Sequence, residues 1–183
     1  MNSTQYSDSM TDIAYTRTGQ KKTVTDAAGT HTFSYTDMLQ RDEEVHPLAG
    51  TTDRAVTIDR EYDAYGRKAR YELRNADEDT VQSISYTYDD VNRLNAVTDS
   101  NGTYNYTYAD STNMVETTEY PNNLSATRKY ESNRNVVDYV ENEVNDTTVS
   151  QYDYTNDAAG KRTDVERTGT AFNQSDEISY DYN

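Results

Sequence analysis

The chain has 183 residues, a formal net charge of −16 and hydrophobic side chains at only 33% of its positions. Its sequence pI near 4.3 argues against a surface for nucleic acid or anionic membranes, because phosphate groups are bound by positive charge. The chain has no cysteine, which excludes disulfides, and no run of about 18 apolar residues, which argues against membrane insertion. Low hydrophobicity with high charge is also typical of disorder, but 18 tyrosines at strand-like spacing favour a folded chain.

The first part of the chain moves from an irregular segment into hairpins. Residues 1–14 are polar and show no period, so we predict an irregular N-terminal segment. Residues 15–37 are expected to form the first pair of hairpins, with a turn at Asp26-Ala27-Ala28-Gly29. Residues 38–55 interrupt the alternation and contain a proline and a glycine, which predicts a longer surface loop.

The repeating pattern is clearest in residues 84–108. The first five of these residues alternate between apolar and polar side chains, which is the two-residue period of a β-strand. Asp89-Asp90-Val91-Asn92 then supplies turn chemistry, a return strand follows, and Asp99-Ser100-Asn101-Gly102 is expected to form the next turn. The last five residues repeat the alternation with three tyrosines. The unit is therefore strand, turn, strand, turn.

Similar units continue to the end of the chain. Tyr120-Pro121-Asn122-Asn123 is predicted to be a turn, because proline cannot sit in a paired strand. The acidic residues 138–148 are predicted to form a long hairpin tip. Residues 149–182 contain one further repeat and the opening strand of another, whose partner strand is expected beyond residue 183.

Tyrosines recur near the ends of the predicted strands. Their intervals are 20, 27, 26, 20, 22, 24 and 28 residues, and an average of about 24 lies in the range of repeat architectures. Tyrosine can pack its ring while its hydroxyl reaches water or a partner, so this composition favours a single curved sheet over a two-layer sandwich. The aligned tyrosines are Tyr15, Tyr35, Tyr62, Tyr88, Tyr108, Tyr130, Tyr154 and Tyr182.

The segment Tyr62-Asp63-x-x-Gly66-Arg67, with near copies at 88–93 and 154–162, resembles the YD repeat of the Rhs family. These bacterial proteins are related to toxin-complex shell subunits and to teneurins. The resemblance implies an all-β fold in which β-hairpin repeats form one continuous curved or spiralling antiparallel sheet. It covers residues 15–183 as about seven repeats, the last one incomplete. The signature turn residues are Asp63, Gly66, Arg67, Asp89, Asn92, Arg93, Asn133, Arg134, Gly160 and Arg162.

Each signature arginine is expected to pair with a carboxylate of its own or the next hairpin. Asn92 and Asn133 replace the turn glycine, because asparagine tolerates a left-handed conformation. Arg162 is placed after the turn that ends at Gly160.

The sequence offers little support for catalysis, and we expect a protein that is not an enzyme and needs no cofactor. The two histidines, His31 and His46, lack a nucleophile or phosphate-loop motif around them. Glu43-Glu44-Val45-His46 has metal-ligand residue types, but a solvated acidic loop explains it better. The turn aspartates likewise match turn chemistry better than a calcium loop, so no metal site is predicted.

Two functions remain open. The first is a non-catalytic structural segment of a shell that encloses a toxin or another C-terminal polypeptide, with neighbouring repeats or a second copy as partners through open sheet edges. The second is a surface-exposed module for carbohydrate binding or cell adhesion, in which exposed tyrosine rings stack on sugars. The resemblance implies a secreted or cell-surface location in either case. The candidate sugar-binding residues are Tyr86, Tyr88, Tyr104, Tyr106 and Tyr108.

Overall fold

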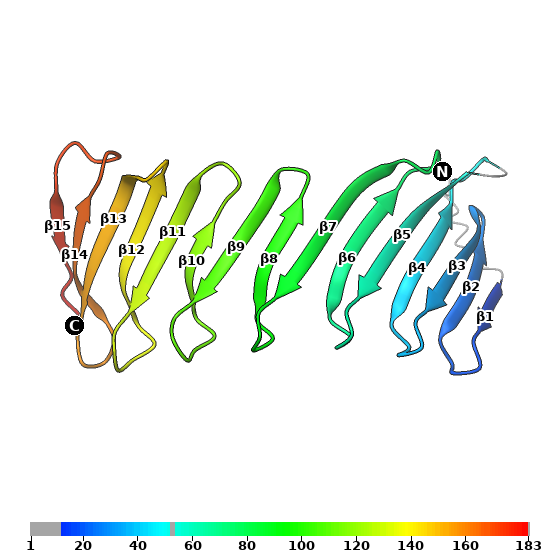
Figure 1. Ribbon diagram of the computed structural model, residues 1–183, viewed down its shortest axis with the longest axis horizontal. Coiled ribbons are helices and arrows are strands. Elements are labelled where there is room, and N and C mark those ends of the chain that lie inside the picture. Colours follow the sequence, from blue (N-terminus) through cyan, green and yellow to red (C-terminus); the bar gives the residue numbers. More distant parts are fainter. Residues whose placement is uncertain (1–11, 52–53, 183) are drawn as a thin grey trace, which may run out of the picture. The chain divides into compact units, whose positions relative to one another are not determined.

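The computed structural model describes residues 12–51 and 54–182, and these residues form β-strands joined by turns, with no helix among them (Figure 1). They contain no helix long and apolar enough to cross a membrane. The chain divides into two compact units, residues 1–86 and residues 87–183. We describe the two units separately.

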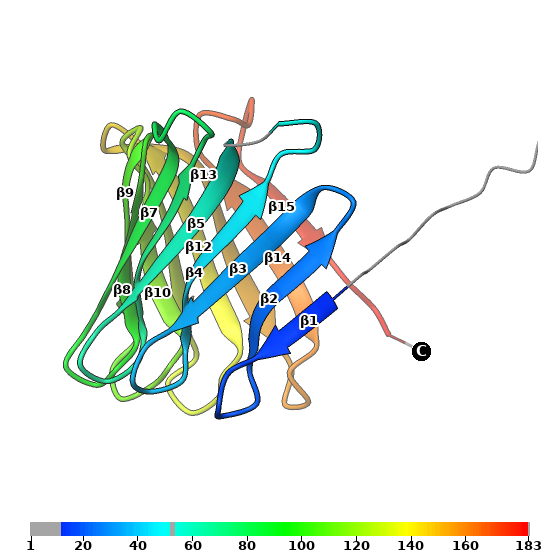
Figure 2. The same cartoon turned by 90° about the vertical axis from the view of Figure 1, so that its right-hand side faces the viewer.

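The first unit is an antiparallel meander in which each strand pairs with its neighbours in the chain (Figure 2). This arrangement follows from the local sequence, since short strands separated by turn residues pair most directly with the next strand. Its strands are β1 (Asp12–Tyr15), β2 (Lys21–Asp26), β3 (Gly29–Tyr35), β4 (Arg41–Pro47), β5 (Ala55–Tyr62), β6 (Lys68–Arg74) and β7 (Thr80–Tyr88).

The second unit has the same construction, again with strand order equal to chain order. The prediction of an all-β array of antiparallel hairpins is therefore confirmed within each unit. Its strands are β8 (Leu94–Asp99), β9 (Gly102–Tyr108), β10 (Val115–Glu119), β11 (Leu124–Tyr130), β12 (Val137–Val144), β13 (Thr147–Asn156), β14 (Arg162–Thr168) and β15 (Asp176–Ser179).

The prediction of a long loop over residues 38–55 was wrong. Residues 41–47 form β4, which pairs with β3 and β5. The break in the alternation does not prevent pairing, because the charge of Glu44 is neutralised within the sheet: Glu44 is only 8% exposed and lies 2.6 Å from Arg60 and 3.4 Å from Arg41. The connection to β5 is shorter than predicted and includes residues 52 and 53, which lie outside the described residues.

The prediction of a long hairpin tip at 138–148 was also wrong. Strands β12 and β13 leave only Asn145 and Asp146 between them, both with positive φ (49° and 59°). Glu141 can remain in the strand because two hydroxyl groups donate to it. Glu141 accepts hydrogen bonds from Tyr139 (2.7 Å) and Thr148 (2.8 Å).

At the N-terminus, β1 begins at Asp12, inside the segment that the sequence suggested was irregular. Residues 1–11 of that segment lie outside the described residues.

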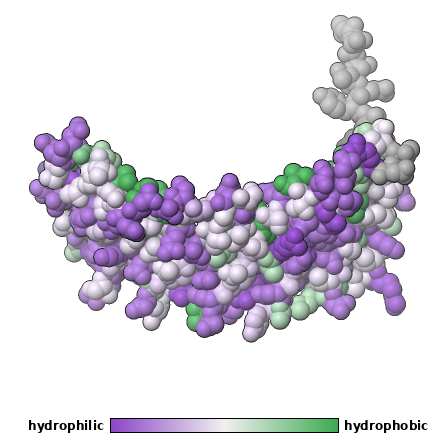
Figure 3. All heavy atoms as spheres, turned by 45° about the horizontal axis from the view of Figure 1, so that its top comes forward, coloured by the Kyte–Doolittle hydropathy of each residue, from purple (hydrophilic) through white to green (hydrophobic). Residues whose placement is uncertain are grey.

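Neither unit has a large hydrophobic core. Among the described residues, the buried hydrophobic side chains are Ala96, Ala126 and Val165, all in the second unit, and no large side chain is fully buried. The visible surface is mostly hydrophilic, with small separate apolar areas (Figure 3). Backbone ladders and cross-strand side-chain contacts must therefore carry more of the stability than core burial does.

Candidate functional site

The signature residues Asp63, Gly66, Arg67, Asp89, Asn92 and Arg93 lie in five-residue turns at the ends of strands. In the turn from Asp63 to Arg67, the Asp63 N–H donates to the Arg67 carbonyl and the Gly66 N–H donates to the Asp63 carbonyl, both at 2.9 Å. Gly66 has φ of 76°, the left-handed region that favours glycine. Asn92 and Gly160 adopt the same conformation in their own turns, with φ of 70° and 79°.

The aspartate side chain holds this turn together. Asp63 Oδ1 accepts the N–H groups of Tyr65 and Arg67 (2.9 Å each), and its Oδ2 accepts Arg67 Nε (2.6 Å). Asp89 makes the equivalent three contacts with Val91 and Arg93 at 3.0, 2.8 and 2.7 Å. These carboxylates therefore serve as structural acceptors within their turns.

The pKa values of both aspartates reflect this arrangement. Burial raises the pKa of Asp63, but the hydrogen bonds and the ion pair with Arg67 outweigh it, so the pKa lies below its ordinary value. The pKa of Asp89 is lowered in the same way, with burial opposed by the contacts from Arg93 and Val91.

Two copies of the motif depart from the alignment made on the sequence. In the turn that begins at Asp157, the residue whose N–H returns to the aspartate is Lys161 (2.9 Å). Arg162 comes one residue later, and its guanidinium lies 3.4 Å from the centre of the Tyr154 ring rather than on a carboxylate.

The turn around Asn133 is one residue longer, running from Glu131 to Val136. Asn133 does not take the positive φ of Asn92. Arg134 nevertheless pairs with Glu131, with 2.5 Å between Nε and Oε2.

Strands β3, β5, β9 and β11 each end in a tyrosine that ties the strand to the one before it. The phenol donates to the carbonyl of the first residue of the preceding strand, which uses both the ring and the hydroxyl within the sheet. These bonds are Tyr35 to Lys21 (2.8 Å), Tyr62 to Arg41 (2.8 Å), Tyr108 to Leu94 (2.7 Å) and Tyr130 to Val115 (2.8 Å); Tyr182, after β15, donates similarly to Arg162 (2.6 Å). We call these bonds the tyrosine clamps.

Asn156 replaces tyrosine at the end of β13 and donates from Nδ2 to the Val137 carbonyl at 3.2 Å. The structural equivalent of the other end-of-strand tyrosines is therefore Asn156, and not Tyr154 as aligned on the sequence. A register shift lies immediately before this end position in several strands, between Ser34 and Tyr35 and between Thr155 and Asn156 among others. Such β-bulges re-aim a side chain at the end of a strand.

The last residue of a turn also reaches the next turn. Gln20 Nε2 donates to the Leu39 carbonyl (2.8 Å) and Gln40 Nε2 to the Gly66 carbonyl (2.7 Å). In the second unit, Arg134 lies inside its turn rather than at its end, but its Nη1 likewise donates to the Asp157 carbonyl of the next turn (2.6 Å). The sequence analysis missed the two glutamines, although they follow Tyr15 and Tyr35 at the same five-residue offset as Arg67 follows Tyr62.

The five candidate sugar-binding tyrosines do not all lie in one unit. Tyr86 and Tyr88 lie on β7, and Tyr104, Tyr106 and Tyr108 lie on β9. Tyr104 packs edge to face on Tyr120, with ring centres 5.9 Å apart. Tyr108 is occupied by its clamp and by the Arg93 guanidinium, 4.3 Å from the ring centre. Sugar stacking on these residues stays a prediction.

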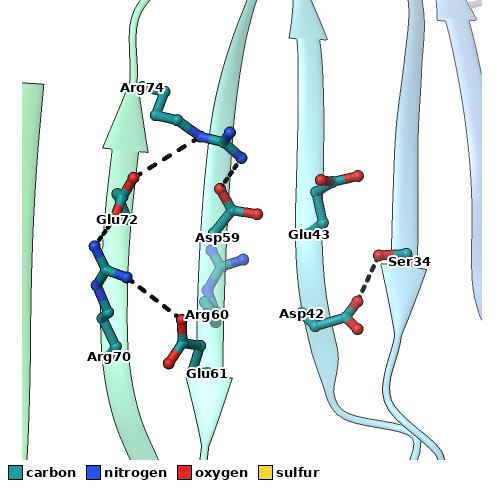
Figure 4. Close-up of a pocket in the computed structure, with 9 residues that line it drawn as sticks. All are labelled: Ser34, Asp42, Glu43, Asp59, Arg60, Glu61, Arg70, Glu72 and Arg74. Carbon is teal, nitrogen blue, oxygen red and sulfur yellow. Dashed lines mark hydrogen bonds and ion pairs between the residues drawn. The ribbon is translucent and has the colours of Figure 1, made fainter. Parts of the chain in front are cut away.

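A shallow charged hollow lies over β4, β5 and β6 in the first unit (Figure 4). Arg70 reaches Glu72 and Glu61, and Arg74 reaches Asp59 and Glu72. The guanidinium groups neutralise these carboxylates, so the hollow resembles an ion-pair network more than a reactive centre. Among the described residues, no group of three or more His, Cys, Asp or Glu side chains is arranged to hold a metal ion.

No family model and no curated protein matches the chain. Solved structures do match. The crystal structure of TcdB2-TccC3 without its hypervariable C-terminal region aligns over 91% of this chain with a TM-score of 0.61 and 18% identity. The crystal structure of TcdB2-TccC3-Cdc42 (17% identity, TM-score 0.35) and the Photorhabdus luminescens Tc holotoxin pore with the TccC3 mutation D651A (18% identity, TM-score 0.34) also align over 91% of the chain.

The chain spans only about a tenth of the length of each of these structures, 9% in the first case. It shares the fold of one stretch of the first structure, which confirms the resemblance to toxin-complex proteins at the level of fold.

Proposed function

We propose that this chain is a non-catalytic structural segment of a shell that encloses a toxin or another C-terminal polypeptide. The observation that carries the proposal is the use of the repeated side chains. Their hydrogen bonds hold hairpins together. Asp63 bonds within its turn, Tyr62 bonds to the preceding strand, and Gln40 and Arg134 bond to the next turn. A sheet built in this way suits an extended wall, because each hairpin is fixed to the next without a second layer.

The fold similarity supports the same proposal. One structure that aligns with this chain, with a TM-score of 0.61, is a TcdB2-TccC3 complex many times longer than the chain. We include in the proposal the secreted or cell-surface location that the resemblance to the Rhs family implies.

The partners in this proposal are neighbouring repeats of a longer protein or a second copy of the chain. Strand β15 pairs with β14 on one side, and no described strand pairs with its other side. The Tyr180 N–H points inward, since it donates to the Thr163 carbonyl at 2.7 Å. Because N–H directions alternate along a strand, those of Glu177 and Ser179 point outward and can accept a further strand.

The test is association through this edge. We expect the chain to self-associate as its concentration rises, as measured by sedimentation velocity. Ser179→Pro removes one outward N–H and should abolish association while leaving the circular dichroism spectrum unchanged. Ile178→Pro is the matched control, because it removes an inward N–H and should disrupt the pairing with β14.

The alternative function gives a different result. If the chain stays monomeric at high concentration and binds a sugar saturably on a glycan array, with binding lost in Tyr106→Ala, the structural proposal is wrong.

A further inference from the structure

Three large apolar side chains are exposed on two neighbouring turns of the first unit. The turn between β3 and β4 contains Met38 and Leu39, which are 62% and 54% exposed. The turn between β5 and β6 contains Tyr65, which is 79% exposed. Exposed apolar side chains that lie together are typical of binding surfaces. We call these three residues the turn patch.

The two turns lie side by side and are fastened to each other (Figure 1). Gln40 Nε2, at the end of the first turn, donates to the Gly66 carbonyl in the second at 2.7 Å. A Cβ built on Gly66 would lie 3.7 Å from Met38 Sδ, so the Met38 side chain reaches the second turn. Asp63 Oδ1 accepts the Tyr65 N–H at 2.9 Å, which holds the second turn in shape. The patch is therefore formed before a partner binds, which lowers the entropic cost of binding.

Leu39 has a backbone conformation that leucine rarely adopts. Its φ is 63°, in the left-handed region where a Cβ is crowded by the backbone, and its half-exposed side chain gains little burial in return. The other described non-glycine residues with positive φ have polar side chains. Strained residues of this kind cluster at functional sites, which points to a role for the Leu39 side chain outside the fold. The equivalent residues in the other five-residue turns after odd-numbered strands are Gly19, Gly66, Asn92 and Gly160.

A shallow groove lies beside Met38 and is lined in part by Asp37 and Asp42. Asp42 accepts a hydrogen bond from the Ser34 hydroxyl at 2.5 Å. No described cation forms an ion pair with either aspartate, since the ion pairs of the first unit use other carboxylates. The groove therefore presents two negative charges beside an apolar side chain.

The other charged side chains that line the groove each have a described partner of opposite charge. Among the described residues, a ligand in the groove therefore meets uncompensated charge at Asp37 and Asp42, and that charge is negative. The existing pairs are Asp63 with Arg67 (2.6 Å), Glu61 with Arg70 (3.5 Å) and Arg60 with Glu44 (2.6 Å).

We propose that the turn patch is a docking surface for a cationic segment of another polypeptide. An apolar side chain of that segment lies against Met38 and Leu39, and a lysine or arginine meets Asp37 and Asp42. Charge complementarity selects this occupant, because the two aspartates repel an acidic segment. This inference does not depend on the proposed shell function.

The direct test is selection of random 12-residue peptides displayed on phage, followed by fluorescence anisotropy with the selected peptides. We expect these peptides to combine large apolar side chains with Lys or Arg and to bind Leu39→Asn at least about tenfold more weakly. Asp37→Asn combined with Asp42→Asn should weaken binding most at low salt. Val81→Thr is the matched control, because Val81 is equally exposed (62%) on β7, and this variant should keep full affinity. Selection of no peptides, of peptides without cations, or of peptides that bind Leu39→Asn as well would overturn the proposal.

The strain at Leu39 gives a second test that needs no partner. Leu39→Asn gives this turn the residue type of Asn92, so it should shift the folding equilibrium toward the folded state by about threefold, measured by urea denaturation. A loss of stability would show that the Leu39 side chain supports the fold and would overturn the proposal. Self-association that Leu39→Asn abolishes and Ser179→Pro leaves intact would place a second copy on the patch and would refute the cationic segment.

Discussion

Each unit contains a row of three carboxylates across neighbouring strands, but described arginines neutralise this row only in the first unit. In the first unit, Glu43, Asp59 and Glu72 lie directly opposite one another on β4, β5 and β6. In the second unit, Asp153, Glu166 and Glu177 lie directly opposite one another on β13, β14 and β15. Like charges in such positions repel and destabilise a sheet.

The two rows differ in the residues beside Glu72 on β6 and beside Glu166 on β14. Glu72 lies between Arg70 and Arg74 on the same face of β6, and both arginines pair with it. Glu166 has Asp164 and Thr168 in those positions on β14. No described cation forms an ion pair with Asp153, Glu166 or Glu177, since the ion pairs of the second unit lie elsewhere.

A tyrosine lies at the end of this acidic row. Tyr139 lies opposite Asp153. Burial raises the pKa of Tyr139 above its ordinary value, followed by its hydrogen bond to Glu141 and the charges of Glu141, Asp153 and Glu143. The backbone ladder and the tyrosine clamps are present with either charge pattern, so the charges on the sheet face can differ between the units.

The largest change in stability is expected when the first unit loses an arginine that neutralises its row of carboxylates. Arg74→Thr gives β6 the residue found in the second unit and leaves Asp59 without its guanidinium. We expect the largest loss in the free energy of unfolding among the variants in this comparison, measured by urea denaturation, because carboxylates that face one another across strands lose a shared cation. Arg17→Thr makes the same charge change at an exposed site and should have little effect; equal losses would contradict the comparison.

The clamps should behave alike in both units. Tyr62→Phe in the first unit and Tyr108→Phe in the second each remove one hydroxyl and leave a backbone carbonyl without its donor. Each should cost about 1 kcal/mol, measured by urea denaturation. Tyr65→Phe, on a ring that is 79% exposed, is the control and should be neutral. A large difference between the two clamp variants would show that the units do not share this feature.

A smaller gain is expected from giving the second unit an arginine. Thr168→Arg places a cation beside Glu166, in the position that Arg74 holds beside Glu72. It should stabilise the chain by about 0.5 kcal/mol, less in high salt, as thermal unfolding at two ionic strengths would show. The comparison fails if Thr168→Arg is destabilising at low salt.

The smallest effect is expected from the turns, and it depends on pH. The pKa of Asp63 is lower in the folded chain than its ordinary value of 3.8, so its contribution is present above that pH and lost as the pH falls through the lowered value. Asp63→Asn should therefore be less stable than the wild type at pH 6 but not at about pH 2. Asp89→Asn should behave the same way, because its turn has the same contacts. Thermal unfolding from pH 6 to pH 2 checks both, and a difference that persists in acid would contradict the assignment.

Local features of the chain were readable from the sequence. The turns at Asp26–Gly29 and Asp99–Gly102 join consecutive strands as predicted, because each depends on a few adjacent residues with turn chemistry. Asn92 adopts the left-handed conformation of a turn glycine, as expected for asparagine. In contrast, β4 was not predicted, because its residues break the apolar–polar alternation. The partners that neutralise Glu44 are Arg41 on the same strand and Arg60 on β5, and only the structure shows them.

Most of the hairpins, the turns at Asp26–Gly29 and Asp99–Gly102 and the recurrence of tyrosine could therefore be predicted from the sequence, since they follow from residues close together in the chain. Only the tertiary structure decided which side chains meet across strands: Asn156 in place of Tyr154, the reach of Gln40 to the next turn, and the contact between His31 and His46. The physical reason is register. One bulged residue moves every later side chain to the other face of a strand, and the position of a bulge depends on the paired strand as well as on its own residues.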